Sequence, residues 1–136
     1  MRLWHYKLIP YLPNKMLVSQ WRECIAIKRQ WEKGTLKHRL VSYVMNYDTD
    51  LFNKYVTIIC KEMDNRNIKY QNKYYDEIWE FCIDNTSLVY ITNTHYPEHN
   101  DRYLRQCYYN LQEKYDRGII SSEEWNLINK NKGGIK

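Results

Sequence analysis

A single carboxylate, Glu23, interrupts the most basic part of the chain. Residues 1–47 hold nine lysines and arginines against two acids, whereas residues 48–136 hold twelve against fourteen. No lysine or arginine stands three or four positions from Glu23, where a helix would form an ordinary surface ion pair. Because a carboxylate weakens the binding of a polyanion, proton transfer on the bound molecule would explain its presence. A solvated helix glutamate is the simpler alternative.

The basic residues around Glu23 follow helical spacing. Seven, seven and four positions separate the members of one row, which is therefore expected to form a stripe along one side of a helix: Lys15, Arg22, Arg29 and Lys33. Such a stripe is typical of a protein that binds nucleic acid, and a solvated basic face is the alternative. Four more residues of this half are expected to contact DNA: Arg2, Lys37, His38 and Arg39.

A second group of reactive side chains occupies the stretch THYPEHND. His95, Glu98, His99 and Asp101 are of types that bind divalent metals, which would make the chain a metal-dependent nuclease. However, Pro97 interrupts the spacing of the two histidines and suits the first turn of a helix. Acidic side chains are favoured at such a position without any metal. The metal-dependent nuclease is therefore a rival prediction.

The fourteen tyrosines are a third candidate group, because their rings can stack on unpaired bases. Those at helical spacing, Tyr55 and Tyr108 among them, are more typical of a hydrophobic core. Three lie outside such a pattern and remain candidates for base stacking: Tyr43, Tyr47 and Tyr74.

Helices must position most of these residues. Cap signals and hydrophobic spacing predict helices over 15–33, 48–65, 69–83 and 97–118, and a short one from residue 121. The first of these predictions uses Asn14 as the N-cap and Gly34 as the stop. The remaining strand signal is weak and covers residues 87–92.

The sequence also predicts the structure of the segments outside these helices. Residues 1–13 contain Pro10 and Pro13 and are expected to form an extended N-terminal arm, and residues 130–136 a short basic tail. The whole chain, 1–136, is predicted to be one compact domain of mainly α class.

The cysteines and the apolar runs exclude other classes of protein. Adjacent cysteines are at least 22 positions apart, too far for a local zinc or redox pair, so we expect four reduced core residues: Cys24, Cys60, Cys82 and Cys107. Apolar runs such as residues 25–27 are much too short to span a bilayer. We therefore expect no membrane segment.

The triplet Trp21-Arg22-Glu23 resembles the aromatic-Arg-Glu motif of the pyrimidine-dimer DNA glycosylase family. Residues 14–20 (NKMLVSQ) and 52–68 (FNKYVTIICKEMDNRNI) are also similar to that family. The opening MRLWH, with LIP at 8–10 and the pair Lys37-His38, resembles a bacterial branch of it. The resemblance covers about residues 1–70 and extends in part to 96–115.

This resemblance implies a mechanism. In that family the fold is a compact set of helices, the nucleophile is the α-amino group of the chain, and a glutamate of the triplet transfers protons. The implied catalytic residues are Met1, Glu23 and Arg22, with Arg22 gripping DNA beside the lesion. A general property supports a terminal amine: with an ordinary pKa of about 7.7–8.0, roughly a tenth of α-amino groups are neutral at pH 7, far more than of lysines.

The resemblance also implies the biological setting. A repair glycosylase with abasic-site lyase activity would act on double-stranded DNA, as a monomer without metal or organic cofactor. Its expected location is the cytoplasm of a bacterial or phage-infected cell.

Three positions depart from the family's pattern. Arg2 is too bulky for ordinary removal of the initiator methionine, so the nucleophilic amine would belong to Met1. Leu3 and Met16 stand where the family's phage member has a basic residue and a histidine. A non-catalytic DNA-binding or accessory protein of the same fold is therefore the alternative function.

Overall fold

The computed structural model describes residues 1–87 and 94–132, and these ranges contain helices and no strand. The mainly α class predicted from the sequence is confirmed. The elements are a 3-10 helix η1 (Tyr6–Tyr11), α1 (Asn14–Glu32), a second 3-10 helix η2 (Ser42–Asn46), α2 (Thr49–Asn65), α3 (Asn72–Asn85), α4 (Asp101–Asp116) and α5 (Ser122–Lys130). The weak strand signal over 87–92 lies outside the described residues except for Ser87, which is in neither a helix nor a strand.

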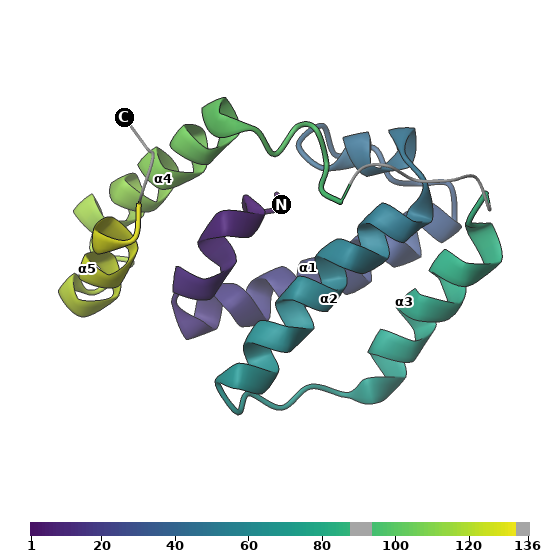
Figure 1. Cartoon of the computed structure of the whole chain (residues 1–136), viewed down its shortest axis with the longest axis horizontal. Coiled ribbons are helices and arrows are strands. Elements are labelled where there is room, and N and C mark those ends of the chain that lie inside the picture. The colour runs from purple at the N-terminus through teal and green to yellow at the C-terminus, as the bar shows by residue number, and fades with distance from the viewer. Residues whose placement is uncertain (88–93, 133–136) are drawn as a thin grey trace.

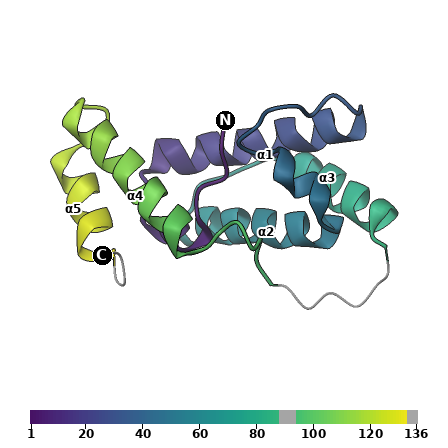
Figure 2. The same ribbon diagram turned by 90° about the horizontal axis from the view of Figure 1, so that it is seen from above.

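The helices form two groups with the N-terminal segment between them. Helices α1 and α2 pack against each other, and α3 packs against both. Helices α4 and α5 pair on the other side, and η1 contacts α2, α4 and α5 (Figure 1). A view from above shows the N-terminus beside α1 (Figure 2). The start of the chain therefore lies where the two groups of helices meet.

Local capping explains where several helices begin and end. The Asp48 side chain accepts a hydrogen bond from the Asp50 amide at the start of α2. Ser121 and Glu124 form the reciprocal capping box predicted for α5. Gly34, with a φ of 72°, follows the end of α1 in a conformation that favours glycine. These sequence predictions are confirmed.

Two predicted helix starts need correction. Pro13, not Asn14, is the N-cap of α1, and the Asn14 side chain accepts a hydrogen bond from Arg66 instead. Helix α4 begins at Asp101 after the N-cap Asn100, so Pro97 lies in the preceding turn. The Asn100 side chain accepts a hydrogen bond from a backbone amide of α4, which fixes the start four residues later than proline alone suggests.

The expectation of an extended N-terminal arm is wrong. Residues 6–11 form η1, and the apolar side chains of this segment are buried in the core: Leu3, Trp4, Leu8, Ile9 and Leu12. The guanidinium of Arg66, the C-cap residue of α2, donates to the carbonyls of Ile9, Pro10 and Leu12 at 2.6–3.3 Å. Apolar burial and this arginine together give the segment a fixed position despite its two prolines.

The core also contains the cysteines. All four are buried and free, as expected from their spacing. No helix of the described chain is both long and apolar enough to cross a bilayer.

Two buried histidines connect the N-terminal segment to the turn before α4. His5 precedes η1, and its Nδ1 accepts a hydrogen bond from the Lys7 amide at 3.1 Å. Its ring stacks on that of His99, whose Nε2 lies 2.7 Å from the Tyr43 hydroxyl oxygen. Burial lowers the pKa of His5 from 6.5 to about 4 and the pKa of His99 to about 3. Both rings are therefore neutral in the folded protein near pH 7.

We expect the free energy of unfolding to fall as the pH drops from 7 to 5. The folded protein keeps His5 and His99 neutral over this range, whereas the unfolded chain binds protons at both below about pH 6.5. Well below that pH, each histidine lowers the free energy of unfolding by roughly 1.4 kcal/mol per pH unit. Urea unfolding at pH 7, 6 and 5 measures the effect. Equal stability at pH 7 and pH 5 would contradict the expectation.

Candidate active site

A buried glutamine holds the first residues of the chain against α1. The Gln20 side-chain oxygen accepts a hydrogen bond from the Trp4 amide at 2.7 Å. Its Nε2 donates to the Arg2 carbonyl at 2.9 Å. Gln20 is 1 % exposed, so little water competes for these bonds. The residue next to Met1 is therefore tied to the middle of α1.

The Gln20 side chain also contacts Glu23, the candidate acid–base residue. Gln20 Nε2 also donates to Glu23 Oε2 at 3.1 Å, one helical turn further along α1. We call the Gln20 side chain, with its hydrogen bonds to Arg2, Trp4 and Glu23, the Gln20 bridge. Glu23 is partly exposed and forms no ion pair with any described residue. The bridge thus places the carboxylate and the start of the chain on the same flank of α1.

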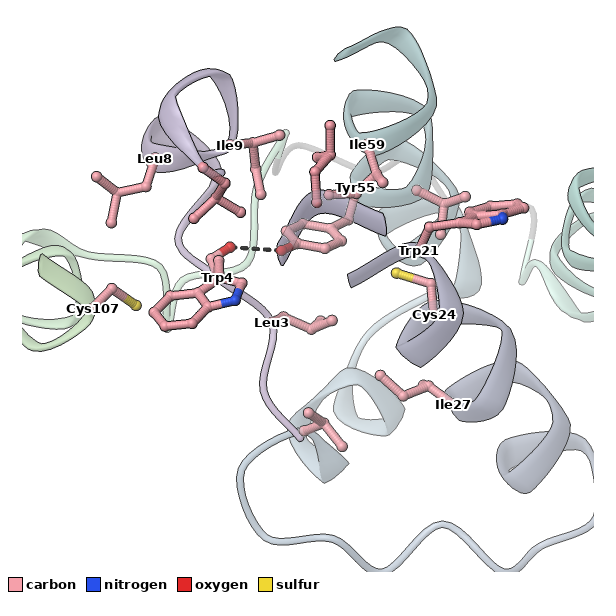
Figure 3. Close-up of a cluster of buried hydrophobic side chains, with 14 of the residues drawn as sticks. Leu3, Trp4, Leu8, Ile9, Trp21, Cys24, Ile27, Tyr55, Ile59 and Cys107 are labelled. Atoms are coloured by element: carbon pink, nitrogen blue, oxygen red, sulfur yellow. Dashed lines mark hydrogen bonds between the residues drawn. The ribbon is translucent and has the colours of Figure 1, made fainter. Parts of the chain in front are cut away.

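Two tyrosines fix the backbone between Met1 and η1. The Tyr55 hydroxyl on α2 donates to the Trp4 carbonyl oxygen at 2.6 Å (Figure 3). The same hydroxyl lies 3.1 Å from the Gln20 side-chain oxygen. The Tyr103 hydroxyl on α4 donates to the Leu3 carbonyl at 2.6 Å. Helices α1, α2 and α4 therefore all bind this short segment. Met1 itself is 36 % exposed, so a macromolecular substrate can approach it.

The basic stripe lies mainly on the flank of α1 beside α3, which is not the flank that holds the Gln20 bridge. Arg22 is exposed beside α3, where it lines a hollow that also includes Tyr74. Arg29 Nη2 lies 3.6 Å from a carboxylate oxygen of Glu77, and its guanidinium lies over the Tyr74 ring. The described contacts therefore leave Arg22 available to an anion, whereas Arg29 already has an acidic partner.

The remaining predicted DNA contacts are spread along α1 and the turn after it. Lys15 is exposed, and its Nζ donates to the Ile119 carbonyl near α5. Lys33 is exposed at the far end of α1, roughly 27 Å along the helix from Lys15. Three exposed residues follow between α1 and η2: Lys37, His38 and Arg39. Arg2 is half-buried, with its guanidinium 5.2 Å from the centre of the Trp4 ring.

The residues proposed for a metal site have other partners. The Tyr47 hydroxyl donates to Glu98, and the His95 ring stacks on Tyr6 with 3.6 Å between centroids. His99 is paired with a tyrosine hydroxyl. Across residues 1–87 and 94–132 no three histidine, cysteine or acidic side chains form a group that could hold a metal ion. The geometry of these residues does not support the metal-dependent nuclease.

The three tyrosines that are candidates for base stacking differ in their side-chain contacts. Tyr43 and Tyr47 are partly buried, and their hydroxyls bind His99 and Glu98. Tyr74 is partly exposed, with Arg29 and Lys73 near its ring. All three rings pack against the core; the hydroxyls of Tyr43 and Tyr47 have side-chain partners there, whereas the Tyr74 ring lies next to basic side chains.

The most informative site residue, Gln20, was missed by the sequence predictions. A signal for it existed, because Gln20 lies on the core side of α1 with Leu17, Trp21 and Cys24. A polar side chain on such a side must find hydrogen-bond partners. Those partners could not be named, since Arg2 and Trp4 are 18 and 16 positions away.

Comparison with known proteins shows the class of enzyme and the family to which the chain belongs. Residues 1–76 match a family model of DNA glycosylases, enzymes that act on DNA, and this match spans more than half of the chain. The chain belongs to the pyrimidine dimer DNA glycosylase family. The resemblance found in the sequence is confirmed. The comparison with curated proteins and that with solved structures each gave no match.

The matched range contains the whole Gln20 bridge. It includes η1, α1 and α2, and it ends within α3. Helices α4 and α5 lie beyond it, although Tyr103 of α4 binds the N-terminal segment. Part of the environment of Met1 therefore comes from outside the matched range.

Proposed function

We propose that this protein is a DNA glycosylase with abasic-site lyase activity on pyrimidine dimers or related lesions in double-stranded DNA. The α-amine of Met1 is the nucleophile, Glu23 transfers protons, and Arg22 contacts DNA beside the lesion. The Gln20 bridge carries this proposal, because one amide holds both the residue after Met1 and the Glu23 carboxylate. Family membership supplies the substrate class.

The first stage removes the base. The nitrogen of the Met1 amine bonds to deoxyribose C1′ as the bond from C1′ to the base breaks, and the base leaves with the electron pair and takes up a proton. The attached nitrogen gives up its one extra proton, which supplies the proton that the departing base takes up. The nitrogen lone pair then forms a double bond to C1′, which gives the iminium, as O4′ leaves C1′ and accepts a proton from Glu23.

The second stage cuts the strand. Glu23, now a carboxylate, removes a proton from C2′, a double bond forms between C2′ and C3′, and the phosphate leaves C3′ with the electron pair of the C3′–O bond. Water then hydrolyses the imine and restores the amine. Every step uses the amine, one carboxyl group and water, so the proposal includes no metal or organic cofactor.

The proposed DNA surface follows α1 across the site. The stripe residues Lys15, Arg22 and Lys33, the turn residues 37–39 and Arg2 lie along the phosphates, with Arg29 at the margin because Glu77 already pairs with it. Glu23 lies on the neighbouring flank of the same helix. DNA over the exposed side of α1 would contact both flanks.

Borohydride trapping on a duplex with one abasic site tests the proposal. Borohydride reduces an iminium to a stable amine, so we expect a covalent protein–DNA adduct in the presence of EDTA. Acetylation of the terminal amine, verified by intact-mass measurement of the N-terminal residue, should abolish the adduct while DNA binding persists.

Each other outcome contradicts part of the mechanism. An adduct that survives complete blocking of the terminus would assign the nucleophile to a lysine. DNA binding without any adduct would favour the non-catalytic DNA-binding protein. Strand cleavage that EDTA abolishes would instead require a metal.

A further inference from the structure

Helices α4 and α5 lie outside the range 1–76 that the family model matches, yet both pack against the segment that begins with the proposed nucleophile (Figure 1). The rings of Tyr108 and Tyr115 on α4 lie against that of Trp125 on α5, which joins the two helices into a pair. Each helix of this α4–α5 pair also contacts η1. The pair is therefore a second support for the start of the chain, besides α1.

Tyr103 is the residue of α4 that binds the segment before η1. The Asn100 side chain accepts a hydrogen bond from the Tyr103 amide, which fixes Tyr103 in the first turn of α4. Its ring packs against the His99 ring, with 5.2 Å between centroids, and its hydroxyl donates to the Leu3 carbonyl at 2.6 Å. Burial raises the pKa of Tyr103, so the hydroxyl keeps its proton near neutral pH and remains a donor.

Two successive carbonyls near Met1 are thus held by two different helices. Gln20 of α1 donates to the Arg2 carbonyl, and Tyr103 of α4 donates to the Leu3 carbonyl. A segment held at one carbonyl can still turn about that bond, whereas anchors on two helices limit its rotation as well as its displacement. The Cα atoms of Met1 and Leu3 are at most about 7 Å apart, because two residues separate them. The placement of the Met1 amine therefore depends on both anchors.

We propose that Tyr103 is a positioning residue for the reaction of the Met1 amine and that the α4–α5 pair completes the active site by supplying it. Through the backbone of Leu3, the Tyr103 hydroxyl holds the amine where it can attack deoxyribose C1′ and where Glu23 can transfer protons. Tyr103 itself contacts no reacting atom. This assignment rests on the proposed glycosylase function and extends the site beyond the matched range.

Tyr103→Phe tests the assignment, because it removes the hydroxyl and keeps the ring. With saturating protein, we expect single-turnover adduct formation on an abasic duplex to slow about tenfold, part of the roughly hundredfold loss that a displacement of about 1 Å can cause. The protein concentration that gives half of the maximal rate should not change, since the exposed basic residues that bind phosphates are unaffected.

Tyr108→Phe is a matched control on the same helix. The Tyr108 hydroxyl donates to the Asn129 side chain of α5, so this variant also loses one hydrogen bond but leaves the N-terminal segment untouched. Both variants should unfold at lower urea concentrations than the wild type, and only Tyr103→Phe should form the adduct more slowly.

A small reagent separates the placement of the amine from its reactivity. Dilute acetic anhydride can reach a terminal amine from many directions, and Met1 is 36 % exposed. We expect Met1 to be acetylated at the same rate in the wild type and in Tyr103→Phe, as measured by the mass of the N-terminal peptide.

The other outcomes are distinct. A wild-type rate of adduct formation in Tyr103→Phe would overturn this assignment alone, and equal slowing in Tyr108→Phe would reduce it to an effect of stability. A change in the half-saturating concentration alone would assign Tyr103 to DNA binding, and slower acetylation of Met1 would assign it to the reactivity of the amine; either result overturns the positioning role. Absence of any adduct with the wild-type protein would overturn the proposed function, and this assignment with it.

Discussion

Glu23→Gln is expected to lower the rate of strand cleavage by about 10²–10⁴-fold, the usual contribution of a general acid–base group. Glutamine has the same shape and can still accept the hydrogen bond from Gln20, but it cannot exchange protons with O4′ or C2′. DNA binding should be retained or become tighter, because a negative charge is removed beside the phosphates. Single-turnover cleavage of an abasic duplex and a separate binding titration measure the two effects.

Helix α1 offers a matched control for this variant. Glu32 lies on the same helix, is exposed and pairs with Lys28, so Glu32→Gln makes the same change of charge away from the N-terminal segment. We expect this control to cleave at the wild-type rate. Full activity in Glu23→Gln would refute the assignment of Glu23, and an equal loss in Glu32→Gln would attribute the effect to helix α1 as a whole.

The helices were predictable because their signals are local. The Asp48 cap, the Ser121 capping box and Gly34 each act within a few residues of the helix end that they fix. The hydrophobic spacing of Leu51 and Ile59 needs no knowledge of the partner helix.

The N-terminal segment was mispredicted because its stabilising contacts are distant. Pro10 and Pro13 suggested an arm, and nothing nearby in sequence contradicts that interpretation. The carbonyls of Ile9 and Pro10 in η1 instead bind Arg66, more than fifty positions away, and Tyr103 binds the segment from a hundred positions away. Contacts at such separations follow from the tertiary fold and not from local pattern.

The candidate site could be predicted only in part, because some of its residues have local signals and others depend on distant contacts. Glu23 stands out because its charge opposes that of its surroundings, and the triplet with Arg22 reinforces it. Gln20 carries no charge and precedes the triplet, at the end of the stretch 14–20 that resembles the family. Its importance comes from burial and from partners on two other segments, Arg2 and Trp4 in the N-terminal segment and Tyr55 on α2. This dependence makes Gln20 the second residue whose replacement should have a large effect.

Gln20→Met is expected to lower the rate of adduct formation about a hundredfold, the loss that a displacement of about 1 Å can cause in an active site. Methionine has a similar length but cannot donate to Arg2 or Glu23, so the amine and the carboxylate lose their shared support. The free energy of unfolding should also fall, by about 1–3 kcal/mol, because the Trp4 amide is left buried without its partner. DNA binding should change little, since the exposed basic residues are unaffected.

A stability-matched variant separates positioning from folding. Thr49→Val removes a buried hydrogen bond to the Cys82 carbonyl, between α2 and the end of α3, and should reduce stability without slowing adduct formation. Gln20→Glu provides a second comparison, because it keeps the acceptor for Trp4 but cannot donate to Arg2 and adds a negative charge beside Glu23. We expect it to be as slow as Gln20→Met although its bond to Trp4 remains. If Gln20→Met loses only stability and forms the adduct at the wild-type rate, the Gln20 bridge has a structural role alone.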